Sequence, residues 1–283
     1  MATRPASRAP RSANRLYAQG LARAFGGAII FGLPLLMTME MWALGVYAHP
    51  ARLLLFLGLN FLVLVGLSRF GGFERTESIA EDVLDALAAY GVGIVASAAI
   101  LALFGVLTPA MPLDELAGKV ALQSVPASFG AMIARKQFGD ESEAAEEARA
   151  LRSSGYGGQL FLMLAGALFL AFNVAPTEEM VLIGYMMSPW HALALVAVSI
   201  LLLHALVFAV GFGGQQRRAG GLGFARTLFG HSIPGYAIAL AVSVYVLWTF
   251  GRADGAGPSE IAGAATVLAF PAALGAAIAR LVV

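Results

Sequence analysis

Two carboxylates stand in apolar stretches of this 283-residue chain, in surroundings that resemble each other. Glu40 lies in FGLPLLMTMEMWALGVY, and Glu179 lies in FLAFNVAPTEEMVLIGY. We expect each of them about 12 Å inside a membrane helix, since each precedes the outer end by about eight residues. A carboxylate at that depth costs a few kcal/mol and needs a partner. The pair therefore predicts a site for a cation, or for shared protons, between two parts of the chain.

Further oxygen ligands surround these carboxylates: Thr38 near the first, and Asn173, Thr177 and Glu178 near the second. Pro176 removes an intrahelical hydrogen bond and frees a carbonyl, which predicts a broken helix. Oxygen ligands of this kind suit hard cations such as magnesium or calcium. Another interpretation stays open. Glu40 and Glu179 can instead be helix-packing residues that are neutral in apolar surroundings or hydrogen-bonded to the nearby Thr38 and Thr177, beside a simple proline kink.

A second pair of ionisable residues, Asp85 and His231, falls at aligned positions of two later apolar segments and could form a proton relay. The alternative is that Asp85 complements the dipole of the helix it begins. Phosphate-binding, nucleophile-elbow and zinc-protease motifs are absent from the sequence, and it has no cysteine. The carboxylates also lack an accompanying His or Lys cluster. We therefore expect no catalytic residue, no enzyme activity and no cofactor other than a bound cation.

The elements that position these residues must be membrane helices. The chain is 59% hydrophobic and 12% charged, whereas an ordinary soluble domain carries about 25% charged residues. This composition excludes a soluble globular protein. A bilayer core of about 30 Å needs roughly 20 apolar helical residues. The sequence predicts an all-α membrane protein with eight transmembrane helices, the fourth interrupted by Lys119, Gln123 and Ser124. The predicted spans are approximately 24–48, 51–68, 83–107, 116–134, 159–187, 190–211, 232–250 and 260–282.

The basic residues indicate the orientation. With eight spans, fifteen of the 18 Lys and Arg residues fall on the side of the termini, and Arg52, Lys119 and Arg252 fall on the other. Because cytoplasmic segments carry an excess of Lys and Arg, both termini are expected in the cytoplasm. Residues 1–22 contain four arginines among Ser, Pro and Ala, and are expected to form a disordered basic arm.

The sequence also contains an internal repeat. Residues 115–135 and 260–280 share ten of 21 positions, including Glu, Pro and Arg. The first and fifth predicted spans align as well, as do the third and seventh. We expect two four-helix repeats of the same topology, at 23–135 and 158–283, joined by a charged cytoplasmic linker at 136–157. Parallel repeats of this kind are related by an axis along the membrane normal and are common in transporters.

Three segments carry a resemblance to a known family: FGLPLLMTMEMW (31–42), GKVALQSVPASFGAMIAR (118–135) and FNVAPTEEM (172–180). They resemble a bacterial family of multi-pass integral membrane proteins of unknown function, over most of the chain from Arg23 to Arg280. The resemblance implies an eight-span protein of the bacterial inner (plasma) membrane. It implies no activity, substrate or catalytic residue.

The leading functional hypothesis is a cation channel or cation transporter, with Glu40 and Glu179 as an intramembrane acidic pair at the repeat interface. A homodimer would place four repeats around one axis. The expected partners are the lipid bilayer, a monovalent or divalent cation and a second copy of the chain, and not nucleic acid. The alternative is a non-transporting membrane sensor or binding protein that holds a lipid, a pigment or a small apolar ligand between the repeats.

Overall fold

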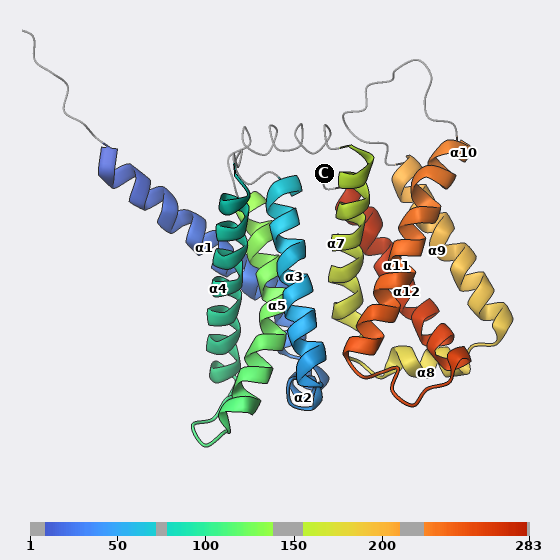
Figure 1. Cartoon of the computed structure of the whole chain (residues 1–283), viewed down its shortest axis with the longest axis horizontal. Helices are drawn as coiled ribbons and strands as arrows, with labels where there is room; N and C mark the ends of the chain where they lie inside the picture. The colour runs from blue at the N-terminus through green and yellow to red at the C-terminus, as the bar shows by residue number, and fades with distance from the viewer. Residues whose placement is uncertain (1–8, 72–77, 138–154, 210–223, 282–283) are drawn as a thin grey trace, which may run out of the picture.

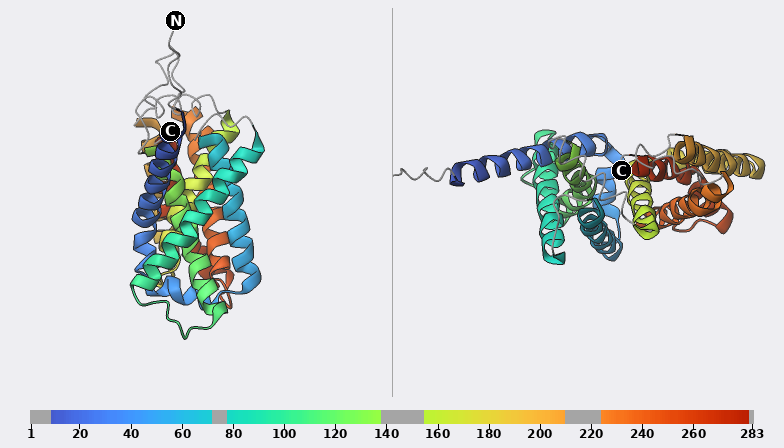
Figure 2. Two further views of the ribbon diagram at one scale, coloured as in Figure 1. Left: turned by 90° about the vertical axis from the view of Figure 1, so that its left-hand side faces the viewer. Right: turned by 90° about the horizontal axis from the view of Figure 1, so that it is seen from above.

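A computed structural model describes residues 9–71, 78–137, 155–209 and 224–281, and every regular element in these ranges is a helix. The helices form two groups that stand side by side (Figure 1). Helix α1 begins and helix α12 ends at the same end of the bundle (Figure 2). The first group holds α1 (Ala9–Leu36), α2 (Met39–Tyr47), α3 (Pro50–Gly71), α4 (Ile79–Leu103) and α5 (Leu113–Gln137). The second holds α7 (Tyr156–Val174), α8 (Glu179–Met186), α9 (Pro189–Ala209), α10 (Phe224–Thr227), the π-helix η1 (Leu228–Ser232), α11 (Ile233–Thr249) and α12 (Pro258–Leu281).

Seven helices in the described part of the chain are long and apolar enough to cross a membrane. Helix α5 is not among them, although it is 25 residues long and runs alongside α3 and α4 (Figure 1). Its interrupting side chains Gln123 and Ser124 are buried, because α1, α2, α3 and α4 pack around it. Polar side chains in membrane helices face the protein interior, so a helix enclosed in this way can be less apolar. The seven segments are 18–36, 50–69, 79–103, 156–174, 189–207, 224–249 and 258–279.

The first and fifth predicted spans are each divided in the structure. Instead of one helix over 159–187, α7 ends at Val174 and the short helix α8 begins at Glu179, so the break predicted at Pro176 is confirmed. The segment 24–48 is also two helices, which differs from the prediction. Pro34 remains inside α1, and the chain turns at Thr38, whose backbone is extended (φ −95°, ψ 113°).

The predicted arm and linker lie partly outside the described residues. Helix α1 already begins at Ala9, within the segment 1–22 that was expected to be disordered, and residues 1–8 are not described. Most of the predicted linker 136–157 falls in the undescribed range 138–154, and α7 begins directly after it at Tyr156.

Glycines let pairs of helices approach closely. A Cβ atom at Gly27 of α1 would overlap the carbonyl oxygen of Gly130 on α5, and the reverse also holds. The same relation joins Gly166 of α7 and Gly275 of α12. Small residues at such crossings allow the van der Waals packing that holds membrane helices together. Two further close approaches join Gly45 of α2 with Gly118 of α5, and Gly184 of α8 with Gly263 of α12.

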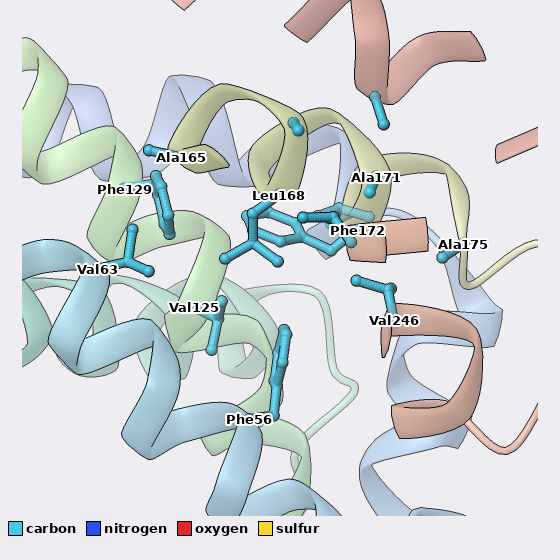
Figure 3. Close-up of a cluster of buried hydrophobic side chains, with 14 of the residues drawn as sticks. Phe56, Val63, Val125, Phe129, Ala165, Leu168, Ala171, Phe172, Ala175 and Val246 are labelled. Carbon is cyan, nitrogen blue, oxygen red and sulfur yellow. The ribbon is translucent and has the colours of Figure 1, made fainter. Parts of the chain in front are cut away.

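The two groups meet through buried aromatic and aliphatic side chains (Figure 3). The ring of Phe56 on α3 contacts that of Phe250 at the end of α11, with the centroids 5.5 Å apart. The ring of Phe129 on α5 lies equally close to that of Phe172 on α7. Edge-to-face rings pack favourably at these distances. The middle of the interface between the groups is therefore filled by apolar side chains.

Candidate functional site

Glu40 and Glu179 both lie in the first turn of a short helix, α2 and α8 respectively. These helices lie at the end of the bundle opposite to the start of α1, an end that also holds the connections 104–112 and 250–257 (Figure 1). We call it the α2/α8 end. Glu40 is half-buried and Glu179 is exposed. The candidate spans before them end at Leu36 and Val174, so neither carboxylate lies within one continuous long helix as predicted, and each follows a helix break. The helix breaks carry both carboxylates out to the end of the bundle.

At the first break, side chains satisfy the last carbonyls of α1. Thr38 Oγ1 donates a hydrogen bond of 2.6 Å to the carbonyl of residue 34, and Trp42 Nε1 donates one of 2.7 Å to that of residue 36. The carbonyl of Leu35 accepts a hydrogen bond of 2.9 Å from Gln123 Nε2 on α5. Backbone polar groups in a membrane must be satisfied by the protein itself. This requirement explains how α1 can end here.

At the second break, Asn173 Nδ2 donates to the carbonyl of residue 169 at 2.6 Å, and Thr177 Oγ1 donates to that of residue 174 at 2.9 Å. The guanidinium of Arg252 donates to the carbonyl of Pro176 and forms an ion pair of 3.0 Å with Glu178. Thr38, Asn173 and Thr177 thus bond to backbone carbonyls of α1 or α7. Contrary to the alternative interpretation, neither threonine bonds to Glu40 or Glu179.

Each Lys and Arg side chain described at the α2/α8 end forms an ion pair with a carboxylate. The pairs are Arg52 with Asp254 at 2.8 Å, Lys119 with Glu115 at 2.6 Å, and Arg252 with Glu178 at 3.0 Å. The Arg52 bond lowers the pKa of the Asp254 carboxyl below its ordinary value. The Lys and Arg side chains described at this end are therefore paired with carboxylates other than Glu40 and Glu179.

The α2/α8 end carries more negative charge than its basic residues compensate. Among the described residues it holds seven carboxylates against three Lys and Arg side chains, with two histidines, His49 and His191, besides. Glu40 and Glu179 have no basic partner in the part of the chain that the structure describes. The carboxylates are Glu40, Asp114, Glu115, Glu178, Glu179, Asp254 and Glu260.

A groove of about 540 Å³ lies between α8 and the start of the connection after α11. Glu178, Glu179, Tyr185 and Arg252 line it together with the aliphatic side chains of α8. Desolvation, and then the negative charge of Glu260, raise the pKa of the Tyr185 hydroxyl, which therefore stays neutral. Within the described ranges no three His, Asp or Glu side chains gather as a metal-binding group. The groove thus offers separate carboxylates beside an apolar wall.

The predicted relay residues lie in different groups of helices. Asp85 on α4 accepts a hydrogen bond of 3.3 Å from Ser68 Oγ on α3. His231, in η1, is bonded through Nε2 to Gln159 Oε1 at 3.1 Å. Figure 1 places α4 on one side of the molecule and η1, beside α10, on the other. The structure does not bring Asp85 and His231 together as a relay.

One buried polar cluster was missed by the sequence analysis. Asn60, halfway along α3, is fully buried, and its Nδ2 donates to Tyr90 Oη of α4 at 2.8 Å and to Ser128 Oγ of α5 at 3.4 Å. The signal was present, because Asn60 is the one amide in the apolar run LLLFLGLNFLVLVGL. Asn60 was not selected because its side chain is neutral and the candidate sites were chosen around ionisable residues inside the predicted spans.

The long apolar helices, with polar side chains turned to the interior, define a multi-pass helical integral membrane protein. Residues 20–283 match the model of DUF2391, a family of integral membrane proteins, and the chain belongs to this family. This confirms the resemblance inferred from the three sequence motifs. No curated protein and no solved structure matched the chain.

Proposed function

We propose that this protein conducts or transports cations across the membrane, and that the α2/α8 end collects them. One observation carries the proposal: Glu40 and Glu179 have no basic partner among the described residues, while the Lys and Arg side chains described at that end are all paired. Uncompensated carboxylates create a negative potential that concentrates cations and accelerates their association. Glu178 and the neutral Tyr185 add oxygen atoms in the groove beside Glu179.

The proposed orientation places the α2/α8 end outside the cell and both termini in the cytoplasm. The basic residues favour it, because fifteen of 18 lie on the side of the termini. We include α5 as an eighth crossing, since it matches its neighbours in length and its polar side chains are buried. The membrane proposed is the bacterial inner membrane, as the family resemblance implies.

We also propose that the two helix groups are repeats of one four-crossing unit. The close approach of Gly27 and Gly130 has its counterpart at Gly166 and Gly275, which are the aligned positions in the sequence. In each group a long helix ends before a short one that has a carboxylate in its first turn. A homodimer, with four such units around an axis, is the proposed assembly.

Cation flux into liposomes tests the proposal. Reconstituted wild-type protein is compared with a Glu40→Gln/Glu179→Gln variant at low and at high ionic strength. Removing the charges is expected to reduce cation uptake about tenfold at low salt, and less at about 1 M salt, where the Debye length is about 3 Å. Glu81→Gln, in the first turn of α4 at the opposite end of the bundle, is the matched control and is expected to keep wild-type flux.

Two results would contradict the proposal at different levels. Absence of cation flux from the wild-type protein would reject transport. Unchanged flux in the double variant at low salt would keep transport but remove Glu40 and Glu179 from it.

A non-transporting binding protein is the second candidate, and the groove favours it. Its volume of about 540 Å³ falls within the range of small-molecule sites, and such sites combine apolar walls with a few polar groups. Mass spectrometry of the purified protein distinguishes the two. A stoichiometric organic ligand that is lost in a Tyr185→Ala variant, without cation flux from the wild type, would establish binding instead.

A further inference from the structure

The polar cluster around Asn60 lies at the depth where transport sites are found. Asn60 is midway along α3 (Pro50–Gly71), about 15 Å from the end of that helix at the α2/α8 end. Its side chain is fully buried, as is that of Ser128, and Tyr90 completes the cluster from α4. A polar group inside a membrane protein is costly unless it is bonded.

Every donor of this cluster is already used. Asn60 Nδ2 donates to the Tyr90 and Ser128 hydroxyls. Those hydroxyls donate in turn to backbone carbonyls, Tyr90 to that of Leu57 at 2.9 Å and Ser128 to that of Val125 at 2.7 Å. These bonds indicate which way the Asn60 amide points. With Nδ2, and not Oδ1, facing the two hydroxyl oxygens, both hydroxyl protons can bond to backbone carbonyls.

What remains is a set of acceptors. Asn60 Oδ1 is buried and receives no hydrogen bond from the described residues. Each hydroxyl oxygen also keeps one lone pair, because a hydroxyl has two and accepts one bond here. No charged side chain bonds to the cluster among the described contacts. The cluster is therefore neutral and rich in oxygen acceptors.

We propose that Asn60 Oδ1, supported by the hydroxyl oxygens of Tyr90 and Ser128, binds a monovalent cation inside the membrane. This inference rests on the proposed function and names the class of ion. Divalent cations are held by carboxylates in most protein sites. Monovalent cations are selected by neutral oxygen dipoles in channels. The carboxylates at the α2/α8 end would attract monovalent and divalent cations alike, and the neutral interior site would favour the monovalent ones.

The second helix group does not repeat this site. Ser199 stands at the aligned position in α9 and donates to the carbonyl of Leu195 in its own helix at 2.6 Å. In the sequence alignment of the two repeats, Tyr236 is at the position of Tyr90 and Ala273 is at the position of Ser128. One site per chain is therefore expected, and Ser199 provides a matched control position at similar burial.

Two measurements test the site. The first is the thermal stability of the purified protein in sodium, potassium or rubidium chloride, compared with choline chloride at the same ionic strength. A bound ion stabilises the folded state. We expect monovalent cations to raise the melting temperature of the wild type and of Ser199→Ala, but not that of Asn60→Leu. The second is rubidium uptake into liposomes, where Asn60→Leu is expected to lose at least about tenfold and Ser199→Ala less than about twofold.

Asn60→Asp is a second variant, which keeps the shape of the side chain and adds a charge. It is expected to bind cations more tightly and to shift the preference toward calcium or magnesium. Cation-independent stability of the wild type would reject the site. Wild-type flux that is unchanged in Asn60→Leu and Asn60→Asp would also reject it. Cation-dependent stability without any flux would keep the site and reject the proposed function.

Discussion

Single side chains at the two helix breaks decide how the chain can stop a helix at a membrane boundary. The first break uses neutral donors, with the hydroxyl of Thr38, the indole of Trp42 and the amide of Gln123 on consecutive carbonyls. The second uses the guanidinium of Arg252, which is itself paired with Glu178. Both solutions meet the demand that backbone groups be satisfied inside the protein. The second also places charge beside the groove.

Replacing Trp42 by Phe keeps the ring and removes the donor to the carbonyl of Leu36. The variant is expected to lose about 1–3 kcal/mol of unfolding free energy, the usual penalty for a buried group left without its bond. Unfolding in detergent with increasing denaturant measures the change. Trp190→Phe is the control, since Trp190 is 78% exposed, and it is expected to be neutral. Equal effects of the two substitutions would contradict a specific role for the Trp42 indole.

At the scale of elements, two helices organise the molecule. Helix α5 packs against α1, α2, α3 and α4, and α12 packs against α7, α8, α9 and α11. Each organising helix meets the long helix before the break at a glycine pair, Gly27 with Gly130 and Gly166 with Gly275. Backbones at such crossings are so close that side-chain volume, and not hydrophobicity, limits the packing.

Adjacent glycines allow a sharp test of this packing. Gly27→Ala is expected to destabilise the protein by about 1–3 kcal/mol, because the added methyl group overpacks the crossing. Gly26→Ala is expected to be neutral or to stabilise by up to about 1 kcal/mol, since nothing lies within 4 Å of the new Cβ atom. Melting temperatures of the two variants in the same detergent give the comparison.

Gly166→Ala extends the comparison to the second group and should resemble Gly27→Ala if the groups are repeats. A stable, native-like Gly27→Ala protein would show that α1 and α5 do not cross as closely as described.

At the scale of the whole molecule, Arg52 links the two groups at the α2/α8 end. From α3 it donates to the carbonyl of Trp248 at 2.9 Å and to Asp254 at 2.8 Å. Its guanidinium also lies 4.8 Å from the centre of the Trp248 ring, within the range of cation–π attraction. Deeper in the bundle, Phe56 and Phe172 join the same two groups in the aromatic cluster.

The Arg52–Asp254 bond predicts a pH dependence of stability. The bond lowers the pKa of Asp254 below its ordinary value of 3.8. Its contribution to stability is therefore present above pH 3.8, and it is lost as the pH falls through the lowered pKa of the folded state. Asp254→Asn is expected to lower the melting temperature at pH 7, with the difference from wild type shrinking below about pH 4.

Thermal unfolding between pH 3 and pH 7 checks this expectation. Asp114→Asn is the matched control, as Asp114 is exposed at the same end and forms no ion pair with a described residue. A difference between Asp254→Asn and wild type that stays constant over this range would contradict the ionic origin of the effect.

Composition and hydropathy alone determine that this chain is a helical membrane protein, because lipid is the only solvent that accepts so apolar a surface. The helix break at Pro176 could also be predicted, since proline lacks the donor that a continuous helix needs. The polarity of α5 could be predicted as well, because Gln123 and Ser124 interrupt its apolar sequence. Their burial explains why a membrane helix can contain them.

The place of Glu40 and Glu179, each in a short helix after a break, was decided by tertiary structure. An apolar run of the right length does not show that α1 ends at Leu36, because that ending depends on a donor from α5, distant in the sequence. The separation of Asp85 from His231 is likewise set by the packing of the two groups. The importance of Asn60 also emerged only in three dimensions, where bonds to α4 and α5 use its donors and its oxygen has no hydrogen-bond partner among the described residues. The sequence by itself determined the solvent and the helices, since these follow from local hydrophobicity. The sites depend on contacts between residues far apart in the chain, and only the tertiary structure decided them.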